Sequence, residues 1–241
     1  MPDKFIEKQS KYWDSYNKGI DTIDLFNIPR AEKIELEFLS QLVGDLSGKN
    51  LLDPGCGTGK FGLKFASTAQ EVVGVDISRN TIEIANNTAK KYGINNFRGE
   101  LNNFKNSPYQ DYFDVALAIN VLHHTDDADI ILKNVYRSLK KGGKLIVFEV
   151  NPLNLLFIPF LISCGQIWSH LTREYVRSNI FSLKKLIETG RFRITKVNKW
   201  CLLPTVLYNR SLAYKRLNET LNRIPLIRTF CAFHVITCQK D

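Results

Sequence analysis

Apolar strand-like runs alternate with segments of helical periodicity along most of this chain. Short apolar runs at 50–52, 71–76, 96–101 and 113–119 predict four strands. Apolar residues at helical spacing lie between these runs and around them. This spacing predicts helices at 3–17, 31–46, 60–66, 79–92, 181–190 and 206–222, with further strands at 191–202 and 231–239. Strands that alternate with helices predict an α/β fold built on a mainly parallel sheet.

Glycines crowd the exit of the first strand. From Asp53 to Gly59 the chain reads Asp-Pro-Gly-Cys-Gly-Thr-Gly, directly before a segment of helical spacing. A turn without side chains lets a bulky ligand touch the backbone where a helix begins. This run therefore predicts a nucleotide-type binding turn.

Spacing decides which nucleotide such a turn can bind. A dinucleotide fingerprint can be placed on 57–62, but that frame begins well after the strand has ended and leaves Asp53 unused. A phosphate-binding P-loop would need glycine at Pro54 and Ser or Thr at Phe61. The frame that uses every unusual residue is Asp-x-Gly-x-Gly-x-Gly, from Asp53 to Gly59.

The next predicted strand also ends in a carboxylate residue. Asp76 ends the run 71–76, where it could accept hydrogen bonds from two ribose hydroxyls. The alternative is a helix-capping role, for which Ser78 is at least as good a candidate. A dinucleotide enzyme would also carry such an acid, so Asp76 does not separate the two ligand classes.

Polar residues also follow the apolar strand at 113–119. Asn120 comes directly after it, and His123 and His124 follow within one turn. Ligands of open α/β sheets bind outside the carboxyl ends of the strands. We therefore expect these side chains to face the same ligand as the glycine turn.

The Asp53–Gly59 frame resembles motif I of the class I methyltransferases that use S-adenosylmethionine (SAM). The stretch around Asn120 is similar to motif IV of their small-molecule members, and 140–149 matches the helix end, Gly-Gly turn and fifth strand that follow. The resemblance covers 31–150 motif by motif and the remainder in outline. It implies one domain over 1–241 with helices on both faces of a seven-stranded, mostly parallel sheet of order 3-2-1-4-5-7-6, whose last strand is antiparallel.

The resemblance also assigns roles to residues. It implies that the glycine turn passes close to SAM, that Asp53 meets the amino group through water, and that Asp76 binds the ribose. An acid after the third strand would accept from the adenine amino group, although the family commonly has aspartate where this chain has Glu100. The expected cofactor-binding residues are Asp53, Gly55, Cys56, Gly57, Gly59, Asp76, Ile77, Glu100, Leu101 and Asn120.

Methyl transfer asks the protein mainly to orient the acceptor and exclude water. A hydroxyl acceptor also needs a general base at neutral pH, and His123 and His124 are the candidates because histidine titrates near that pH. His123 is the first choice, and the alternative for either is a structural hydrogen bond. Glu149, His170 and Tyr175 are weaker candidates, and no metal site is expected.

Charge is divided unevenly along the chain. Residues 1–168 hold 19 Lys and Arg against 20 Asp and Glu, whereas 169–241 hold 14 against 4. A basic surface attracts phosphates, anionic lipid headgroups or nucleic acid, and the alternative is a solvated surface without a partner. The scattered cysteines and the absence of a signal-peptide pattern at the start predict a cytoplasmic protein.

An apolar segment at 153–168 precedes this basic region and is too short to span a bilayer. It predicts a lid over an acceptor pocket, within an insert at 151–180; a second insert is expected at 204–228. The alternative for 153–168 is a helix that packs on the sheet. At the other end, the helices of 1–47 form an expected cap, in which the segment 12–14 would fold over the cofactor.

These observations together predict a SAM-dependent methyltransferase with a small or amphiphilic acceptor, which could be lipid-linked or anionic, methylated at oxygen or carbon. Peripheral contact with an anionic membrane would fit the basic region. The alternatives are a nucleic-acid methyltransferase and a non-catalytic SAM-binding or scaffold protein. Strand four lacks the Asn/Asp-Pro-Pro-Tyr/Phe sequence of amino-methylating nucleic-acid enzymes, so nucleic acid is the less favoured partner. The sequence indicates no oligomeric state.

Overall fold

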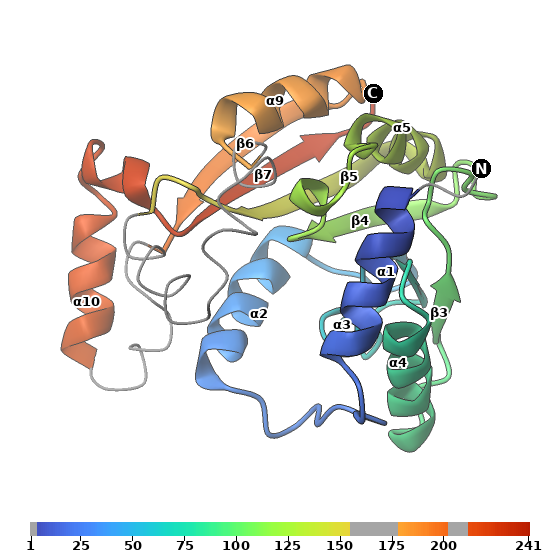
Figure 1. Ribbon diagram of the computed structural model, residues 1–241. Helices are drawn as coiled ribbons and strands as arrows, with labels where there is room; N and C mark the ends of the chain where they lie inside the picture. The colour runs from blue at the N-terminus through green and yellow to red at the C-terminus, as the bar shows by residue number, and fades with distance from the viewer. Residues whose placement is uncertain (1–3, 155–177, 202–211) are drawn as a thin grey trace.

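A computed structural model describes residues 4–154, 178–201 and 212–241. Its seven-stranded sheet has the order β3-β2-β1-β4-β5-β7-β6, which confirms the predicted topology (Figure 1). The strands are β1 Asn50–Pro54, β2 Glu71–Asp76, β3 Phe97–Leu101, β4 Phe113–Ile119, β5 Leu139–Val150, β6 Arg193–Trp200 and β7 Phe233–Gln239.

Strands β3, β2, β1, β4 and β5 pair in parallel, and β7 runs antiparallel to both β5 and β6. Parallel pairing brings the carboxyl ends of β1, β2 and β4 to one edge of the sheet. Every loop that the sequence marked as ligand-binding leaves from this edge. The antiparallel β7 confirms the predicted closing strand.

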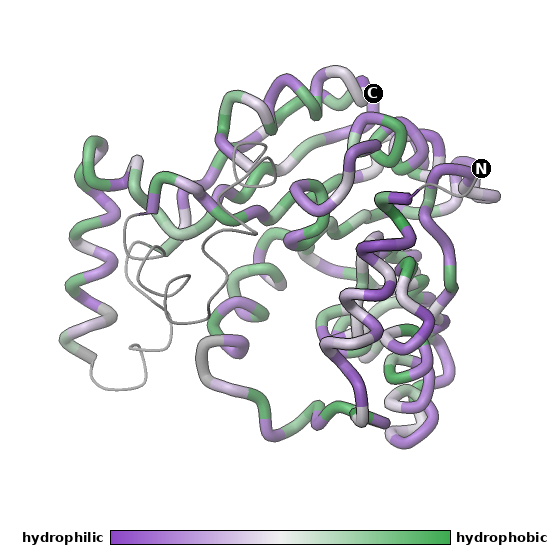
Figure 2. The backbone as a smooth tube through the Cα atoms, viewed as in Figure 1, coloured by the Kyte–Doolittle hydropathy of each residue, from purple (hydrophilic) through white to green (hydrophobic). Residues whose placement is uncertain are grey.

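Helices cover both faces of the sheet (Figure 1). Side chains of α5 and α9 pack on one face and those of α2, α3 and α4 on the other, while α1 packs on α4. Hydrophobic residues are concentrated in the strands, whereas surface helices such as α9 and α10 alternate between hydrophobic and hydrophilic residues (Figure 2). The helices are α1 Lys4–Tyr16, α2 Arg30–Val43, α3 Gly62–Phe65, α4 Arg79–Lys91, η1 Leu122–His124, α5 Ala128–Ser138, α9 Ile180–Thr189, α10 Leu212–Leu221 and η3 Ile227–Phe230.

Two predicted elements differ from the observed ones. The helix expected at 60–66 is a single turn, because the hydroxyls of Ser67 and Thr68 bond back to the carbonyls of Lys64 and Phe65 (2.8 and 3.2 Å) and compete with further helix. The expected Gly-Gly turn lies inside β5, where Gly142 has a φ of +75° and the pairing with β4 shifts register.

Most of the predicted lid at 151–180 lies outside the described residues, as do residues 204–211 of the insert at 204–228 and the candidates His170 and Tyr175. Within the described part of the chain, no helix has both the length and the apolar character needed to cross a membrane.

Candidate active site

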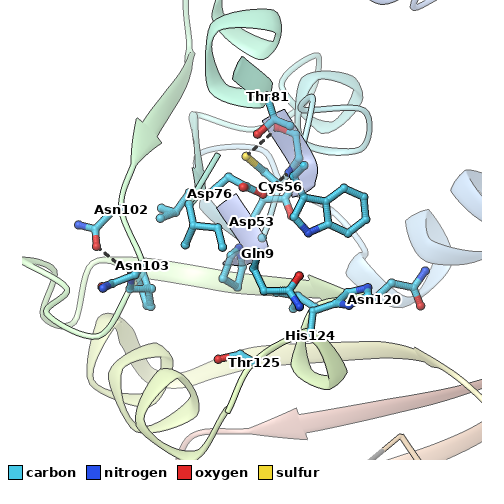
Figure 3. A pocket seen from close by; sticks show the side chains of 18 of the residues that line it. Gln9, Asp53, Cys56, Asp76, Thr81, Asn102, Asn103, Asn120, His124 and Thr125 are labelled. Atoms are coloured by element: carbon cyan, nitrogen blue, oxygen red, sulfur yellow. Dashed lines mark hydrogen bonds between the residues drawn. The ribbon is translucent and has the colours of Figure 1, made fainter. Parts of the chain in front are cut away.

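A cavity of about 430 Å³ opens at the carboxyl ends of β1, β2 and β4. This volume is in the range of small-molecule sites. Figure 3 shows Asp53 and Asp76 in the middle of the view, with Asn102 and Asn103 on one side and Asn120 and His124 on the other. Of the predicted residues, the cavity is lined by Asp53, Gly55, Cys56, Gly57, Asp76, Ile77, Asn120 and His124, and not by Gly59, Glu100, Leu101 or His123.

The glycine turn brings bare backbone to the cavity. Gly55 has a φ of +75°, and a Cβ there would lie 2.3 Å from Cγ2 of Val121, so only glycine fits between β1 and the exit of β4. Gly57 has a φ of +52°, and a Cβ there would meet nothing within 4 Å. Gly59 instead makes room for Ala85 and other packed side chains. All three glycines have the positive φ that the turn needs; Gly55 and Gly57 also line the cavity, whereas Gly59 makes room for packed side chains.

Asp53 lies at the floor of this turn. Its side chain is buried, and the backbone N–H of Gly62 donates to it. Burial raises the pKa of Asp53 to about 7, and the negative charge of Asp76 adds to the rise, while the bond from Gly62 opposes it. A carboxyl with this pKa is poised to ionise when a cation enters the cavity.

Asp76 is fixed by the backbone on both sides. The N–H of Gly57 and the N–H of Ser78 each donate to one of its carboxylate oxygens, both at 2.9 Å. Burial raises the pKa of Asp76 despite these bonds. The carboxyl group of Asp76 lines the cavity, where it can meet a ligand hydroxyl. Ser78, whose Oγ accepts from the N–H of Thr81 at 3.2 Å, provides the N-cap of α4, so the capping alternative falls to Ser78.

The exit of β3 differs from the prediction. Glu100 pairs with Arg98 at 2.9 Å and accepts from the hydroxyl of Tyr109 at 2.6 Å, outside the cavity lining. Asn102 and Asn103 line the cavity instead. The signal in the sequence was this pair of amides directly after the third strand, which can both donate to and accept from a purine edge.

Asn120 occupies the strained exit of β4. It has a φ of +49°, and its N–H donates to the carbonyl of Phe148 at 2.8 Å. Its Oδ1 is buried and has no hydrogen-bond partner in the described structure. A buried acceptor left unpaired beside a cavity costs free energy that a ligand donor would recover.

Glu149 organises the turn after Asn120. It is fully buried, accepts from the N–H groups of Val121 (3.0 Å) and Leu122 (2.7 Å), and pairs with Nδ1 of His123. His123 is therefore held beneath the cavity by a structural hydrogen bond. The sequence indicated Glu149 only as a weak catalytic candidate. Its pairing with His123 joins the ends of two neighbouring strands, β5 and β4, and such a contact cannot be read from a local pattern.

His124 is the histidine that reaches the cavity. Its ring lies 3.9 Å from the ring of His123 and 5.4 Å from that of Trp13, centroid to centroid. The Trp13 contact is edge-on, with an interplanar angle of 83°. This geometry favours His124 over His123, the reverse of the order expected from the sequence.

Comparison with known proteins shows which family the chain belongs to. Residues 45–207 match the family described as "Methyltransferase domain". The chain belongs to the class I SAM-dependent methyltransferases. It is 30% identical over 201 residues to a ubiquinone biosynthesis O-methyltransferase of Coxiella burnetii, covering 80% of this chain and 82% of that protein.

The chain is also similar to two other methyltransferases. O-methyltransferase rstn1 of Aspergillus nomiae is 33% identical over 146 residues, which are 58% of this chain and 60% of that protein. The solved geranyl diphosphate C-methyltransferase of Streptomyces coelicolor A3(2) has the same fold, with a TM-score of 0.64 at 18% identity, over 100% of this chain and 99% of that one.

The cavity of this methyltransferase fits SAM, its cofactor. The bare backbone at Gly57 leaves room for the methionine portion of SAM. The unpaired Oδ1 of Asn120 is a hydrogen-bond acceptor that this portion could use. Asp76, Asn102 and Asn103 also line the cavity, with a carboxyl group and two side-chain amides that can hydrogen-bond to a ligand. In the described part of the chain, no group of three or more His, Cys, Asp or Glu side chains could hold a metal ion.

Helix α1 closes the cavity from the side of β2. Ser10 Oγ donates to the carbonyl of Ile77 at 3.0 Å, and Asp14 accepts from Ser78 Oγ at 2.6 Å and from the N–H of Asn80 at 3.1 Å. Trp13, between these anchors, lines the cavity. This arrangement places an aromatic cover over a polar floor.

Proposed function

We propose that this methyltransferase methylates a hydroxyl of a small or amphiphilic acceptor, with His124 as the general base. The observation that carries the proposal is the position of His124, which lines the cavity beside the unpaired Oδ1 of Asn120. The relatives named as O-methyltransferases support oxygen as the acceptor atom, and carbon is the second candidate.

Different residues of the cavity would bind the cofactor, accept the proton and exclude water. When bound, SAM supplies an activated methyl group, so its S–CH3 bond breaks as the bond to the acceptor oxygen forms. Asp76, Asn120 and the glycine turn hold the cofactor. An imidazole nitrogen of His124 takes the proton from the acceptor hydroxyl, and Trp13 on α1 excludes water from the reacting atoms.

The proposed acceptor class rests on a relative's name and on the charge of the chain. The relative named for ubiquinone biosynthesis and the basic C-terminal third favour an amphiphilic or anionic acceptor, with peripheral contact at an anionic membrane. The cap formed by the helices of 1–47, including α1, is part of the same proposal. A non-catalytic SAM-binding protein is the competing function, and binding of SAM without turnover would favour it.

Transfer of labelled methyl from SAM into fractionated cell extract tests the proposal. The wild type should label a hydroxyl-bearing acceptor, and His124→Gln should lower kcat by roughly a hundredfold, as loss of a general base does. SAM affinity should change less than about threefold, because His124 is not among the proposed SAM ligands. A His124→Gln enzyme with wild-type kcat and pH profile would refute the role of His124.

A further inference from the structure

Exposed apolar side chains and arginines share one surface just before β7. Residues 223–230, here called the 223–230 turn, link α10 to β7. Leu226 is 77% exposed, Ile224 43% and Phe230 40%, and Arg223 and Arg228 are exposed beside them. Exposed large apolar side chains that cluster in this way mark an interaction site rather than ordinary surface.

Helix α10, directly before the turn, carries a further exposed pair. Leu217 is 50% exposed and its neighbour Arg216 is also exposed. The segment 212–230 carries four basic residues and one acidic residue. Arg216, Arg223 and Arg228 form no ion pair with another residue in the described ranges. Their charges are therefore available to an outside partner.

The backbone of the 223–230 turn is held in place. The side-chain amide of Asn151 donates to the carbonyl of Thr229 at 2.9 Å, and that of Asn154 donates to the carbonyl of Phe230 at 3.0 Å. Within the turn, the N–H of Arg228 donates to the carbonyl of Ile224 at 2.9 Å. These bonds fix the backbone while the apolar side chains stay in water.

The turn lies at the edge of the sheet that carries the active site. Val150, at the end of β5, pairs with Phe233 at the start of β7. Since β5 is parallel to β4, this end of β5 faces the same way as the ends of β1, β2 and β4 around the cavity. A partner bound at the turn would meet the protein at its ligand-binding edge.

We propose that the 223–230 turn, with Arg216 and Leu217, docks this enzyme on an anionic lipid bilayer. The apolar tip of Ile224, Leu226 and Phe230 would enter the boundary between headgroups and acyl chains, and the three arginines would contact lipid phosphates. The proposal rests on the proposed function, since an amphiphilic acceptor would be drawn from that bilayer. Charge complementarity favours this occupant. The anionic headgroups of such a bilayer match the arginines, and its acyl chains, directly beneath the headgroups, can take up the apolar tip.

Sedimentation with vesicles tests the docking surface. Wild-type protein should pellet with phosphatidylglycerol-rich vesicles at low salt, much less at high salt, and not with phosphatidylcholine alone. Leu226→Glu should lower the affinity for vesicles at least fivefold. Arg223→Gln with Arg228→Gln should lower it roughly fivefold for each arginine removed. Phe181→Glu is the matched control, because Phe181 is 82% exposed at the start of α9, and it should bind as the wild type does.

Each outcome has one meaning. Unchanged SAM affinity by calorimetry shows that a variant is folded, and vesicle binding needs no turnover, so failure of the proposed reaction would be seen separately. The docking surface is refuted if the wild type stays in the supernatant with anionic vesicles, or if both variants pellet like the wild type. It is also refuted if Leu226→Glu dissociates an oligomer in ultracentrifugation and leaves vesicle binding intact, since the turn would then join copies of the chain.

Discussion

Two buried carboxylates face the cavity with pKa values raised by burial. Asp53 and Asp76 lie close enough that the charge of Asp76 raises the pKa of Asp53 further. Without a ligand, ionising both costs free energy, because neither has a cationic partner among its described contacts. SAM carries an ammonium and a sulfonium group, and either charge would lower that cost. The pair of acids therefore favours a ligand that brings positive charge to the floor of the cavity.

This raised pKa predicts that SAM binding depends on pH. Binding of a cation favours ionised Asp53, so SAM affinity should rise as pH passes through about 7, with Kd about tenfold higher at pH 6 than at pH 8. Calorimetry at both pH values measures the effect. In Asp53→Asn the affinity should be lower and nearly independent of pH, whereas His124→Gln should keep the pH dependence.

The free protein should show the opposite trend in stability. The pKa of Asp53 is raised in the folded state, so the folded state binds the proton more tightly than the unfolded chain. The free energy of unfolding should then decrease as pH rises from about 4, the ordinary carboxyl value, to about 7. Thermal unfolding without SAM would contradict this if Asp53→Asn gave the same pH profile as the wild type.

At the scale of elements, α1 differs from the other helices around the site. None of its residues is buried, and its contacts with the rest of the fold include the hydrogen bonds of Ser10 and Asp14 to 77–80 and the ring contact of Trp13 with His124. Hydrogen bonds of this kind contribute little to global stability compared with a buried apolar face. The helix is therefore suited to open and close over the cavity while the sheet stays folded.

Asp14→Ala should loosen this cap. The change removes the acceptor for Ser78 and Asn80, so SAM affinity should decrease about tenfold, the effect of losing bonds to a charged acceptor. The melting temperature should change little. Calorimetry measures affinity, and hydrogen exchange over residues 4–16 measures docking of α1.

Glu7→Ala is the control on the same helix. It removes only the exposed ion pair with Lys11, which has an N–O distance of 2.6 Å, and such solvent-screened pairs contribute little to stability. Its SAM affinity should stay at the wild-type value. Equal losses in Asp14→Ala and Glu7→Ala would mean that helicity of α1, and not its anchoring, determines affinity.

At the scale of the whole molecule, ligand binding and folding are coupled through the edge of the sheet. The cavity joins residues from α1, β1, β2 and β4 that lie far apart in the chain. SAM should therefore stabilise the fold as a unit. At a hundredfold excess over Kd the gain is ~2.7 kcal/mol, and the melting temperature should rise by roughly 5–10 °C. NAD at the same concentration should give no shift; a shift with NAD and none with SAM would overturn the cofactor assignment.

Prediction from sequence succeeded where the signal was local. Strand β4 is buried on both faces, so its continuous apolar run was enough to predict it. The glycine turn could be predicted because its backbone has positive φ values, which glycine readily adopts. It was less successful where a side chain had a choice of partners. Glu100 bonds to Arg98 and Tyr109 outside the cavity, and Glu149 takes His123 away from the cavity. His123 and Glu149 are 26 residues apart and follow neighbouring strands, whereas the partners of Glu100 lie within nine residues of it and meet it only because the chain after β3 folds back.

The sequence by itself therefore determined the α/β class, the strand order through the family resemblance, and the SAM-binding edge, because periodicity and glycine spacing are properties of short segments. The tertiary structure alone decided that His124 and not His123 lines the cavity, that Asn102 and Asn103 replace Glu100 there, and that Leu226 is left in water. The physical reason is that a side chain's partners are set by the pairing of strands and the docking of helices, which bring together residues that no local pattern relates.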